Sequence, residues 1–210
     1  MPLYKTITVN PTTKVLIWKI EEPFEELSEG IELTDHCRNR VDSMKSDLHR
    51  RGFMSVRHLF AEMGYTDSDL YYDKKGKPHL TDGTKISITH SFTFSAIILS
   101  DVEVGIDIEK HRSKILKIAH KFTTVEDYKT LNNYDALARK LTMVWGAKES
   151  IYKSFAEKGV SFLKHIYVED FPLDHCETTA GVSYEGKAQD YHIWFLEFEG
   201  FTCAYAKILK

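Results

Sequence analysis

The amino-acid sequence predicts an α+β fold, and three observations support this prediction. Apolar residues recur at three- and four-residue spacing over residues 34–63 and again over 135–158, as in amphipathic helices. Residues 86–109 alternate between apolar and polar side chains or form short apolar runs, which is typical of strands. Residues 166–208 contain several more strand patterns. A few long helices beside many strands place the chain in the α+β class.

The N-terminal part of the chain begins with β structure and continues into the first helical region. Residues 1–20 are expected to form strands, with the apolar run 15–18 buried. An acidic amphipathic turn is expected after Pro23. Within the helical region, Gly52 is expected to mark a break or a kink. Residues 70–80 are then expected to form extended chain around a turn.

The middle of the chain is rich in strands. Residues 86–91 alternate in polarity and end at His90-Ser91, and the run 94–99 follows. The clearest period-two segment comes next, with Val102, Val104, Ile106 and Ile108 on one face and acidic residues or glycine on the other.

The remaining elements follow in order. We expect a helix over residues 114–121, a capping box over 123–126, and the longest helix over 135–158. The expected strands of the C-terminal part span 166–168, 182–184, 191–198 and 202–208.

The length of 210 residues allows one large domain or two small ones. Residues 1–100 and 101–210 share a crude order of helix followed by strands, which is weak evidence for duplication. We therefore expect an N-terminal lobe over 1–100 and a C-terminal lobe over 101–210. A hydrophobic fraction of 42% is sufficient for a packed core.

Charge and cysteine usage exclude several classes of protein. With 28 Lys and Arg against 31 Asp and Glu, the net charge of −3 argues against a nucleic-acid-binding protein. The three cysteines, Cys37, Cys176 and Cys203, form no C-x-x-C pair, so neither a zinc site nor a disulfide framework is indicated. A signal-peptide pattern and a membrane-spanning apolar run are also missing from the sequence, so a cytoplasmic protein is expected.

The strand around residue 107 carries two acidic residues on one face. Asp107 and Glu109 are two residues apart, which places their backbones roughly 7 Å apart on the same side. Gly105 on that face is expected to leave room for a ligand, and paired carboxylates suit Mg²⁺. An ordinary half-exposed strand face with alternating acids remains the alternative.

The long helix carries a second charged group. Lys148 falls within the apolar stripe, where an ammonium group is costly unless it reaches an anion or water. Glu149 and Lys153 form an i,i+4 pair just outside the stripe, which alone is common as a surface salt bridge. With Lys148 beside them, these residues favour a phosphate and metal site at the edge of the core.

Together these segments resemble the 4'-phosphopantetheinyl transferase superfamily, in its longer, single-chain Sfp-like branch. The strand Gly105-Ile106-Asp107-Ile108-Glu109 matches the family pattern G-[IV]-D-x-E. Trp145, Lys148, Glu149 and Lys153 match W-x-x-K-E-x-x-x-K, and the two glutamates lie 149 − 109 = 40 residues apart. Three further matches are Gly76-Lys77-Pro78, Ile88-Thr89-His90-Ser91, and the segment from Lys121-Phe122-Thr123 to Glu126.

The resemblance implies two similar α/β lobes related by a pseudo-twofold axis, with the active site between them, in a chain that acts as a monomer. It implies transfer of 4'-phosphopantetheine from coenzyme A to a serine of an apo acyl or peptidyl carrier protein, which releases adenosine 3',5'-bisphosphate. Mg²⁺ is the implied cofactor, with Mn²⁺ as a substitute. The pathway would be fatty acid or secondary metabolite biosynthesis, and neither nucleic acid nor membrane is implied as a partner.

The resemblance also implies roles for individual residues. Asp107, Glu109 and Glu149 would hold Mg²⁺, and Glu149 and Lys153 would be catalytic. The implied contacts to coenzyme A are Arg51, Lys77, Pro78, His90, Ser91, Asp107, Lys148 and Lys153.

Three questions stay open at this stage. The basic residue for the 3'-phosphate could be Arg50 or Arg57 in place of Arg51, and a solvated basic helix face also explains these arginines. The helix over 114–122 is a candidate carrier surface, although a solvated helix is the simpler explanation. Another metal-dependent phosphoryl enzyme, or a binder of coenzyme A or carriers without activity, is the alternative function.

Overall fold

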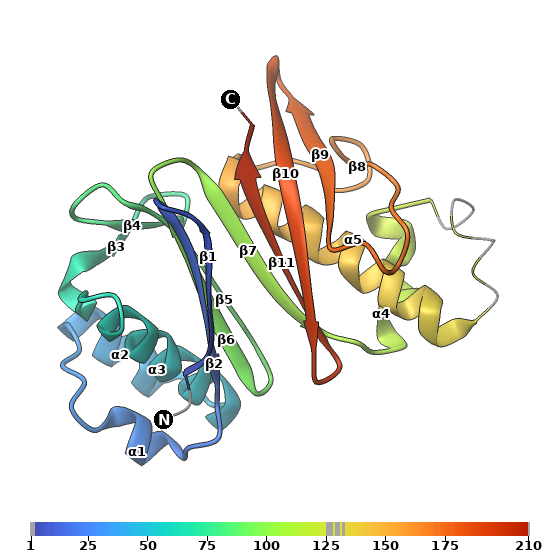
Figure 1. The fold of residues 1–210 in the computed structure, drawn as a ribbon. Helices are drawn as coiled ribbons and strands as arrows, with labels where there is room; N and C mark the ends of the chain where they lie inside the picture. Colours follow the sequence, from blue (N-terminus) through green and yellow to red (C-terminus); the bar gives the residue numbers. More distant parts are fainter. Residues whose placement is uncertain (1–2, 125–127, 129–130, 132, 210) are drawn as a thin grey trace. The chain divides into compact units, whose positions relative to one another are not determined.

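The computed structural model describes residues 3–124, 128, 131 and 133–209, and the chain divides into two compact units, Met1–Asp101 and Val102–Lys210. Each unit contains a main antiparallel sheet and helices (Figure 1). The α+β class predicted from the sequence is therefore confirmed. The capping box expected over residues 123–126 lies partly outside the described residues.

The main sheet of the first unit has the strand order β1-β2-β6-β5, and all neighbouring strands are antiparallel. Its strands are β1 (Leu3–Asn10), β2 (Thr13–Lys19), β5 (Lys85–Ser91) and β6 (Phe94–Ser100). Strands β2 and β6 lie in the middle, and every residue of β6 is buried. The predicted strands over 15–18, 86–91 and 94–99 are confirmed.

Three helices cover one face of this sheet (Figure 1). They are α1 (Phe24–Ser28), α2 (Asp35–Ser43) and α3 (Asp47–Ala61). The longest, α3, buries Val56, Leu59 and Phe60 in one cluster with Leu16 and Ile97 of the sheet. This burial supplies the main hydrophobic driving force for the first unit.

The predicted break of the helical region at Gly52 is wrong. The chain leaves the helix at Met44 and begins α3 after Ser46, whose side chain accepts a hydrogen bond from the backbone N–H of His49. A serine at this position is a strong helix start signal. Gly52 instead lies inside α3, where the helix passes close to His90.

A short two-stranded sheet completes the first unit. It follows the 3-10 helix η1 (Asp67–Asp69) and consists of β3 (Leu70–Tyr72) and β4 (Pro78–Leu80), which pair in antiparallel register. The predicted extended chain around a turn is confirmed here. The five residues 73–77 connect the two strands.

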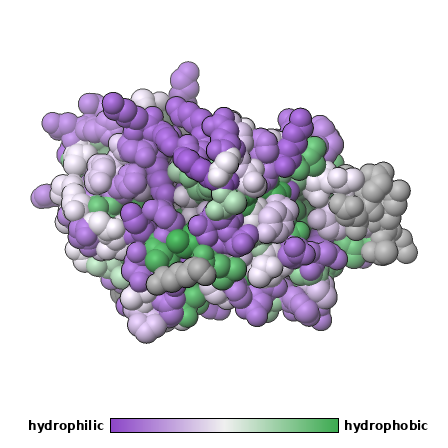
Figure 2. Space-filling model, turned by 90° about the horizontal axis from the view of Figure 1, so that it is seen from above, coloured by the Kyte–Doolittle hydropathy of each residue, from purple (hydrophilic) through white to green (hydrophobic). Residues whose placement is uncertain are grey.

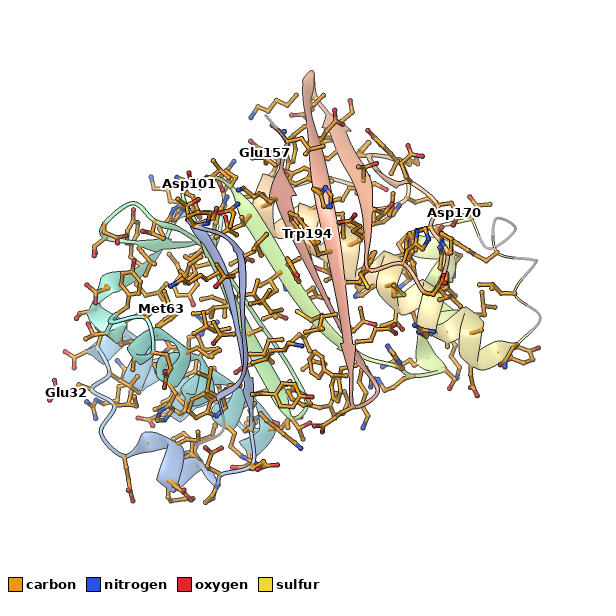
Figure 3. The ribbon with its side chains drawn as sticks, in the orientation of Figure 1. Glu32, Met63, Asp101, Glu157, Asp170 and Trp194 are labelled. Atoms are coloured by element: carbon orange, nitrogen blue, oxygen red, sulfur yellow. The ribbon has the colours of Figure 1, made fainter. Side chains whose placement is uncertain are left out.

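The main sheet of the second unit has the order β7-β11-β10-β9-β8, again antiparallel throughout. Its strands are β7 (Val104–Lys110), β8 (Ile166–Val168), β9 (Glu177–Tyr184), β10 (Lys187–Phe198) and β11 (Phe201–Ile208). The predicted strand over 166–168 is confirmed with identical bounds, whereas β9 begins earlier than predicted. An aromatic stack on this sheet joins Trp194, labelled in Figure 3, to His192 and Tyr205.

The helices of the second unit lie on one face of its sheet (Figure 1). They are α4 (Lys114–Ile118), the 3-10 helix η2 (Ala119–Lys121) and α5 (Tyr134–Phe155). The apolar stripe of α5 packs Leu141, Val144 and Ile151 in one cluster with Ile193 and Ala204. The helix ends before the predicted residue 158 because Ala156 adopts the left-handed conformation, with φ of 54°.

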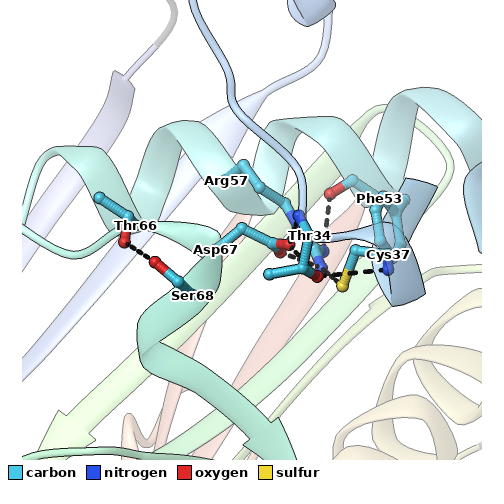
Figure 4. Close-up of polar contacts among 7 residues, drawn as sticks. All are labelled: Thr34, Cys37, Phe53, Arg57, Thr66, Asp67 and Ser68. Atoms are coloured by element: carbon cyan, nitrogen blue, oxygen red, sulfur yellow. Dashed lines mark hydrogen bonds and ion pairs between the residues drawn. The ribbon is translucent and has the colours of Figure 1, made fainter.

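A buried ion pair connects α3 to the start of η1 (Figure 4). The guanidinium of Arg57 lies 2.9 Å from the carboxylate of Asp67 and also donates to the carbonyl of Phe53. Burial alone would raise the pKa of Asp67, but the N–H of Thr34 and the charge of Arg57 hold that pKa below its ordinary value. Thr34 caps α2, so this cluster also fixes where that helix starts.

Hydrophilic residues predominate on the face shown in Figure 2. Within the residues that the structure describes, no helix is both long and apolar enough to cross a membrane. Cys37, Cys176 and Cys203 are free thiols.

Replacing Arg57 with methionine should lower the free energy of unfolding by about 3–5 kcal/mol, because Asp67 would remain as a buried charge without its partner. Urea denaturation measures this loss. Lys187→Met is the matched control, because it removes the exposed ion pair with Glu157 and should cost less than about 1 kcal/mol. Equal losses in the two variants would contradict the role given to Arg57.

Candidate functional site

The candidate site of the second unit lies where β7 packs against α5. Gly105, Asp107 and Glu109 lie on the same face of β7, as the period-two pattern predicts. Strand β7 is buried from Val104 to Ile108, so this is not the half-exposed strand face of the alternative interpretation. The acidic face is directed toward α5, as the contacts below show.

A very close approach between backbone segments holds the helix on the strand. A Cβ atom on residue 105 would lie 1.8 Å from the carbonyl oxygen of Ser150, so only glycine fits here. The expectation that Gly105 leaves room for a ligand is therefore wrong, because α5 itself fills that space. The hydroxyl of Ser150 donates to the carbonyl of Gly146 at 2.7 Å and of Ala204 at 2.9 Å, which ties α5 to β11 as well.

Lys153 joins α5 to the strand electrostatically. Its Nζ donates to Oδ1 of Asp107 at 2.7 Å and to the carbonyl of Ile106 at 2.9 Å. The side chain of Asp107 is 8% exposed and that of Lys153 is 29% exposed, so the pair is sheltered from solvent. Lys153 of α5 therefore pairs with Asp107 of β7. The i,i+4 surface salt bridge with Glu149, which was the alternative from the sequence, is a different contact.

The carboxylate of Glu149 is electrostatically strained. Its pKa is raised from 4.5 to about 7, first by burial and then by the negative charge of Asp107, with Lys153 opposing and Glu109 adding to the rise. Burial and Asp107 also raise the pKa of Glu109. Three carboxylates thus lie within electrostatic reach of one another, and their mutual repulsion favours a bound cation.

Trp145 is a site residue for which the sequence indicated no individual role. Its side chain makes a hydrogen bond with the carboxylate of Glu109. Its ring packs edge-on against Phe122, with 5.1 Å between ring centroids, and also contacts Phe162. Trp145 therefore orients Glu109. In the sequence, this residue was marked only as the tryptophan of the W-x-x-K-E pattern, four residues before Glu149.

The chemistry of these carboxylates fits Mg²⁺, which prefers hard oxygen ligands and takes one or two carboxylates together with phosphate oxygens and water. Within the described part of the chain, no three His, Cys, Asp or Glu side chains are already grouped as ligands of one metal. Lys153 occupies Oδ1 of Asp107. Binding of Mg²⁺ by Asp107, Glu109 and Glu149 would therefore require side-chain rearrangement.

Lys148 has a different role from the expected one. Its Nζ donates to the carbonyl of Phe162 at 2.8 Å and of Ile166 at 2.5 Å, and the residue is 5% exposed. Burial lowers the pKa of this lysine to about 8. The sequence correctly indicated that its ammonium needs a partner, but the partners are backbone carbonyls inside the unit rather than phosphate oxygens. These contacts remove the reason for assigning Lys148 to coenzyme A.

In the first unit, His90 lies at the exposed end of β5 beside α3. A Cβ on residue 52 would lie 3.0 Å from Cγ of His90, so the missing side chain of Gly52 makes room for the imidazole. The ring of His49 lies 6.0 Å from that of His90. Ser91 ends the strand, and the next residue, Phe92, has a φ of 52°, which is a strained value for a non-glycine residue.

Lys77 and Pro78 lie at the end of the 73–77 turn and the start of β4. Lys77 is partly buried, and its backbone N–H donates to the carboxylate of Asp73 at 2.9 Å. Gly76 before it has a φ of 87°, which glycine adopts without strain.

The three arginines considered for the 3'-phosphate differ in their surroundings. Arg57 is 4% exposed and paired with Asp67, so it is excluded as a ligand contact. Arg51 donates to the carbonyls of Glu22 and Ile20 at 2.7 and 3.2 Å, which fixes its guanidinium beside the end of β2. Arg50 lies over a phenylalanine ring, 3.7 Å from its centroid.

The structure thus brings together Asp107, Glu109, Glu149 and Lys153 in the second unit. In the first unit it places His90 against Gly52 of α3. Glu109 also lines a cavity of about 180 Å³ in the second unit. Its lining includes Lys110, Arg112, Lys114, Ile115, Thr142 and Trp145.

The site combines an acidic strand with a helix that carries Lys and Glu, and the comparisons with known proteins identify the family. Residues 103–206 match the 4'-phosphopantetheinyl transferase superfamily, and the chain belongs to that family. The match covers both β7 and α5, and it confirms the resemblance seen in the sequence.

Two individual relatives show how far the similarity extends. The chain is 26% identical over 153 residues to the 4'-phosphopantetheinyl transferase gsp of Aneurinibacillus migulanus, which is 70% of this chain and 62% of that protein. It is 29% identical over 127 residues to enterobactin synthase component D of Salmonella typhimurium, which is 59% of this chain and 53% of that protein. The similarity thus spans between about half and two thirds of the length of these relatives.

Gly105→Ala should prevent α5 from seating on β7, because the added methyl group would overlap the carbonyl of Ser150. We expect a loss of at least about 3 kcal/mol in unfolding free energy, the upper end for overpacking. Ser183→Ala, at an exposed position of β9, is the control and should remain within about 0.5 kcal/mol of the unchanged protein. Near-normal stability of Gly105→Ala in urea denaturation would contradict the close approach.

The raised pKa of Glu149 predicts a pH dependence of stability in the metal-free protein. The folded state holds this proton more tightly than the unfolded chain, so folded stability should fall as pH rises from about 4.5 to about 7. Glu149→Gln cannot titrate and should show a smaller decline, with the remainder coming from Glu109, whose pKa is also raised. Urea denaturation in EDTA across pH 4.5–8 measures the difference. Glu32→Gln, at an exposed carboxylate labelled in Figure 3, should keep the decline, and an unchanged slope in Glu149→Gln would refute the assignment.

Proposed function

We propose that this chain transfers the 4'-phosphopantetheine group of coenzyme A to a serine of an apo carrier protein, which converts it to the holo form. The observation that supports this most directly is the pairing of Asp107 and Glu109 on β7 with Glu149 and Lys153 on α5. This arrangement lies within the segment that matches the family. Of the two relatives, one is a 4'-phosphopantetheinyl transferase and the other is a component of enterobactin synthase.

In the proposed reaction the serine oxygen attacks the β-phosphorus of coenzyme A. The bond between that phosphorus and the oxygen bridging to the α-phosphate breaks, and adenosine 3',5'-bisphosphate leaves. Mg²⁺, when bound, would neutralise charge on the phosphate oxygens. Manganese would be a substitute with the same oxygen ligands.

The protein's own residues would position the reactants and accept the proton. Glu149 would take the proton of the serine hydroxyl as a general base, directly or through a metal-bound water. Lys153, which can exchange its contact with Asp107 for a phosphate oxygen, would stabilise negative charge on the transferring group. Asp107, Glu109 and Glu149 would supply the carboxylate ligands.

The remaining proposed contacts to coenzyme A come from the first unit. Lys77 with Pro78, and His90 with Ser91, would face its nucleotide and phosphates. Arg51 remains the proposed contact for the 3'-phosphate. Two backbone carbonyls use two of its five N–H groups, and its third nitrogen, Nη1, lies 3.9 Å from Oδ2 of Asp47. Lys148 is not part of the proposal.

The carrier protein would dock beside the cavity that begins at Glu109. Lys114 and Lys117 are exposed on α4, and the apolar side chain of Ile115 lines the cavity next to them. A basic rim around an apolar floor suits an acidic helical partner. The proposal includes a cytoplasmic, monomeric enzyme that acts on fatty-acid or secondary-metabolite carriers.

The intact mass of a carrier protein tests this function. Incubation of an apo acyl carrier protein or a peptide-synthetase carrier with the chain, coenzyme A and Mg²⁺ should add one phosphopantetheine, and EDTA should prevent the gain. Asp107→Ala and Glu149→Gln should each lower the rate by at least about a thousandfold, as expected when a metal ligand or base is lost. Full activity of either variant at saturating Mg²⁺ would exclude the proposed site.

Thermal unfolding provides a readout that does not depend on activity. Mg²⁺ should raise the melting temperature of the unchanged protein, because a ligand that binds only the folded state stabilises it by mass action. The same increase in Asp107→Ala would place the ion elsewhere. If no mass gain occurs on either carrier while coenzyme A binds, the chain is a binder without transferase activity.

A further inference from the structure

The turn between β3 and β4 is organised by one carboxylate. Asp73 follows β3, and its Oδ1 accepts the backbone N–H of Lys75 at 2.8 Å and of Lys77 at 2.9 Å. Its backbone N–H donates to the carbonyl of Lys77 at 3.0 Å, and its carbonyl accepts the N–H of Gly76 at 3.0 Å. Both backbone polar groups of Lys77 are therefore held by the same residue.

The neighbours of this carboxylate limit its movement. Nε2 of His79 lies 3.3 Å from Oδ2 of Asp73, and the ring of His79 stacks on Tyr71 with centroids 5.3 Å apart. Pro78, the first residue of β4, has no backbone N–H, so Lys77 carries the last backbone donor before His79. Without the Asp73 side chain, the N–H of Lys77 would lose the partner that fixes its peptide plane.

We propose that Asp73 is a positioning residue, which holds the backbone of Lys77 so that its ammonium is presented to an anionic group of coenzyme A. The inference rests on the proposed function, in which Lys77 contacts that substrate. Residues 73–77 contain three lysines, and mutual repulsion would spread them without an internal acceptor. Asp73 organises this turn through the backbone, because its Oδ1 accepts the N–H groups of both Lys75 and Lys77.

A second turn of the same unit shows that this geometry alone is ordinary. Oδ1 of Asp82 accepts the N–H of Thr84 at 2.9 Å, and Oδ2 accepts the hydroxyl of Tyr65 at 2.7 Å. The turn also contains a glycine with positive φ, but residues 81–84 include no lysine. Asp82 therefore provides a matched control, because its carboxylate holds the backbone N–H of Thr84 rather than that of a lysine.

The test compares binding and turnover in a set of variants: Asp73→Ala, Asp73→Asn, Lys77→Ala, the double variant Asp73→Ala/Lys77→Ala, and Asp82→Ala. Isothermal titration gives the dissociation constant for coenzyme A, and initial rates give KM and kcat. Asp73→Ala should weaken binding and raise KM roughly tenfold, the size expected when a hydrogen bond that serves a charged group is lost. The value of kcat should remain within about twofold, because the carboxylates of the second unit are unchanged.

Two comparisons separate positioning from general stability. Asparagine keeps the Oδ1 acceptor, so Asp73→Asn should retain most of the affinity, whereas Asp82→Ala should leave it unchanged. In the Lys77→Ala background, removal of Asp73 should have no further effect, because the two residues act through one contact.

Two results would overturn the inference. In the first, Asp73→Ala weakens coenzyme A binding as much in the Lys77→Ala background as in the unchanged protein. In the second, Asp73→Asn and Asp73→Ala lose the same amount of affinity. Failure of the proposed function gives a different result. If the unchanged protein binds coenzyme A but modifies no carrier, the proposed transfer fails, and the titrations still decide the role of Asp73. If the unchanged protein does not bind coenzyme A, both proposals are overturned.

Discussion

The site depends on the close approach of α5 to β7 at Gly105. A side chain at this position would overlap the carbonyl of Ser150, so the distance between helix and strand is set by the absence of a Cβ atom. The hydroxyl of Ser150 then bonds to Ala204 on β11, which anchors the same helical turn to a second strand. Because Glu149 is adjacent to Ser150, this contact also determines how near its carboxylate lies to Asp107. A wider helix–strand spacing would separate the acidic residues and remove their electrostatic coupling.

Because this packing brings carboxylates together, their repulsion lowers the stability of the folded protein. Burial and the charge of Asp107 raise the pKa of both Glu109 and Glu149, and the ammonium of Lys153 opposes only part of this rise. Strongly shifted pKa values are common at functional sites. The repulsion between neighbouring carboxylates that causes such a shift is relieved when a cation binds between them. By contrast, Arg57 and Asp67 in the first unit form a buried pair with hydrogen bonds from Thr34 and to Phe53. That pair is satisfied within the fold and needs no ligand.

Much of this arrangement could be predicted from local patterns. Alternation identified β7, the 3.6-residue period identified α5, and the order of the motifs identified the family. The partners of Lys148 could not be predicted, because Phe162 and Ile166 are brought to it only by the path of the chain after α5. Gly105 and Gly52 were misread for a similar reason, since a missing side chain reveals its purpose only when the opposing segment is known. Sequence periodicity shows which face a residue occupies, whereas tertiary packing decides what that face meets.

The two units would contribute differently to the proposed reaction. The carboxylates and Lys153 all belong to the second unit, which contains the whole segment matching the family. The proposed contacts to the nucleotide, Lys77, His90 and Arg51, all belong to the first unit, and each is fixed by backbone or packing contacts of its own. Substrate affinity and the chemical step would therefore depend on residues of different units. Changes within the first unit could then alter the preference for one coenzyme A derivative over another while the metal site and the base remain intact.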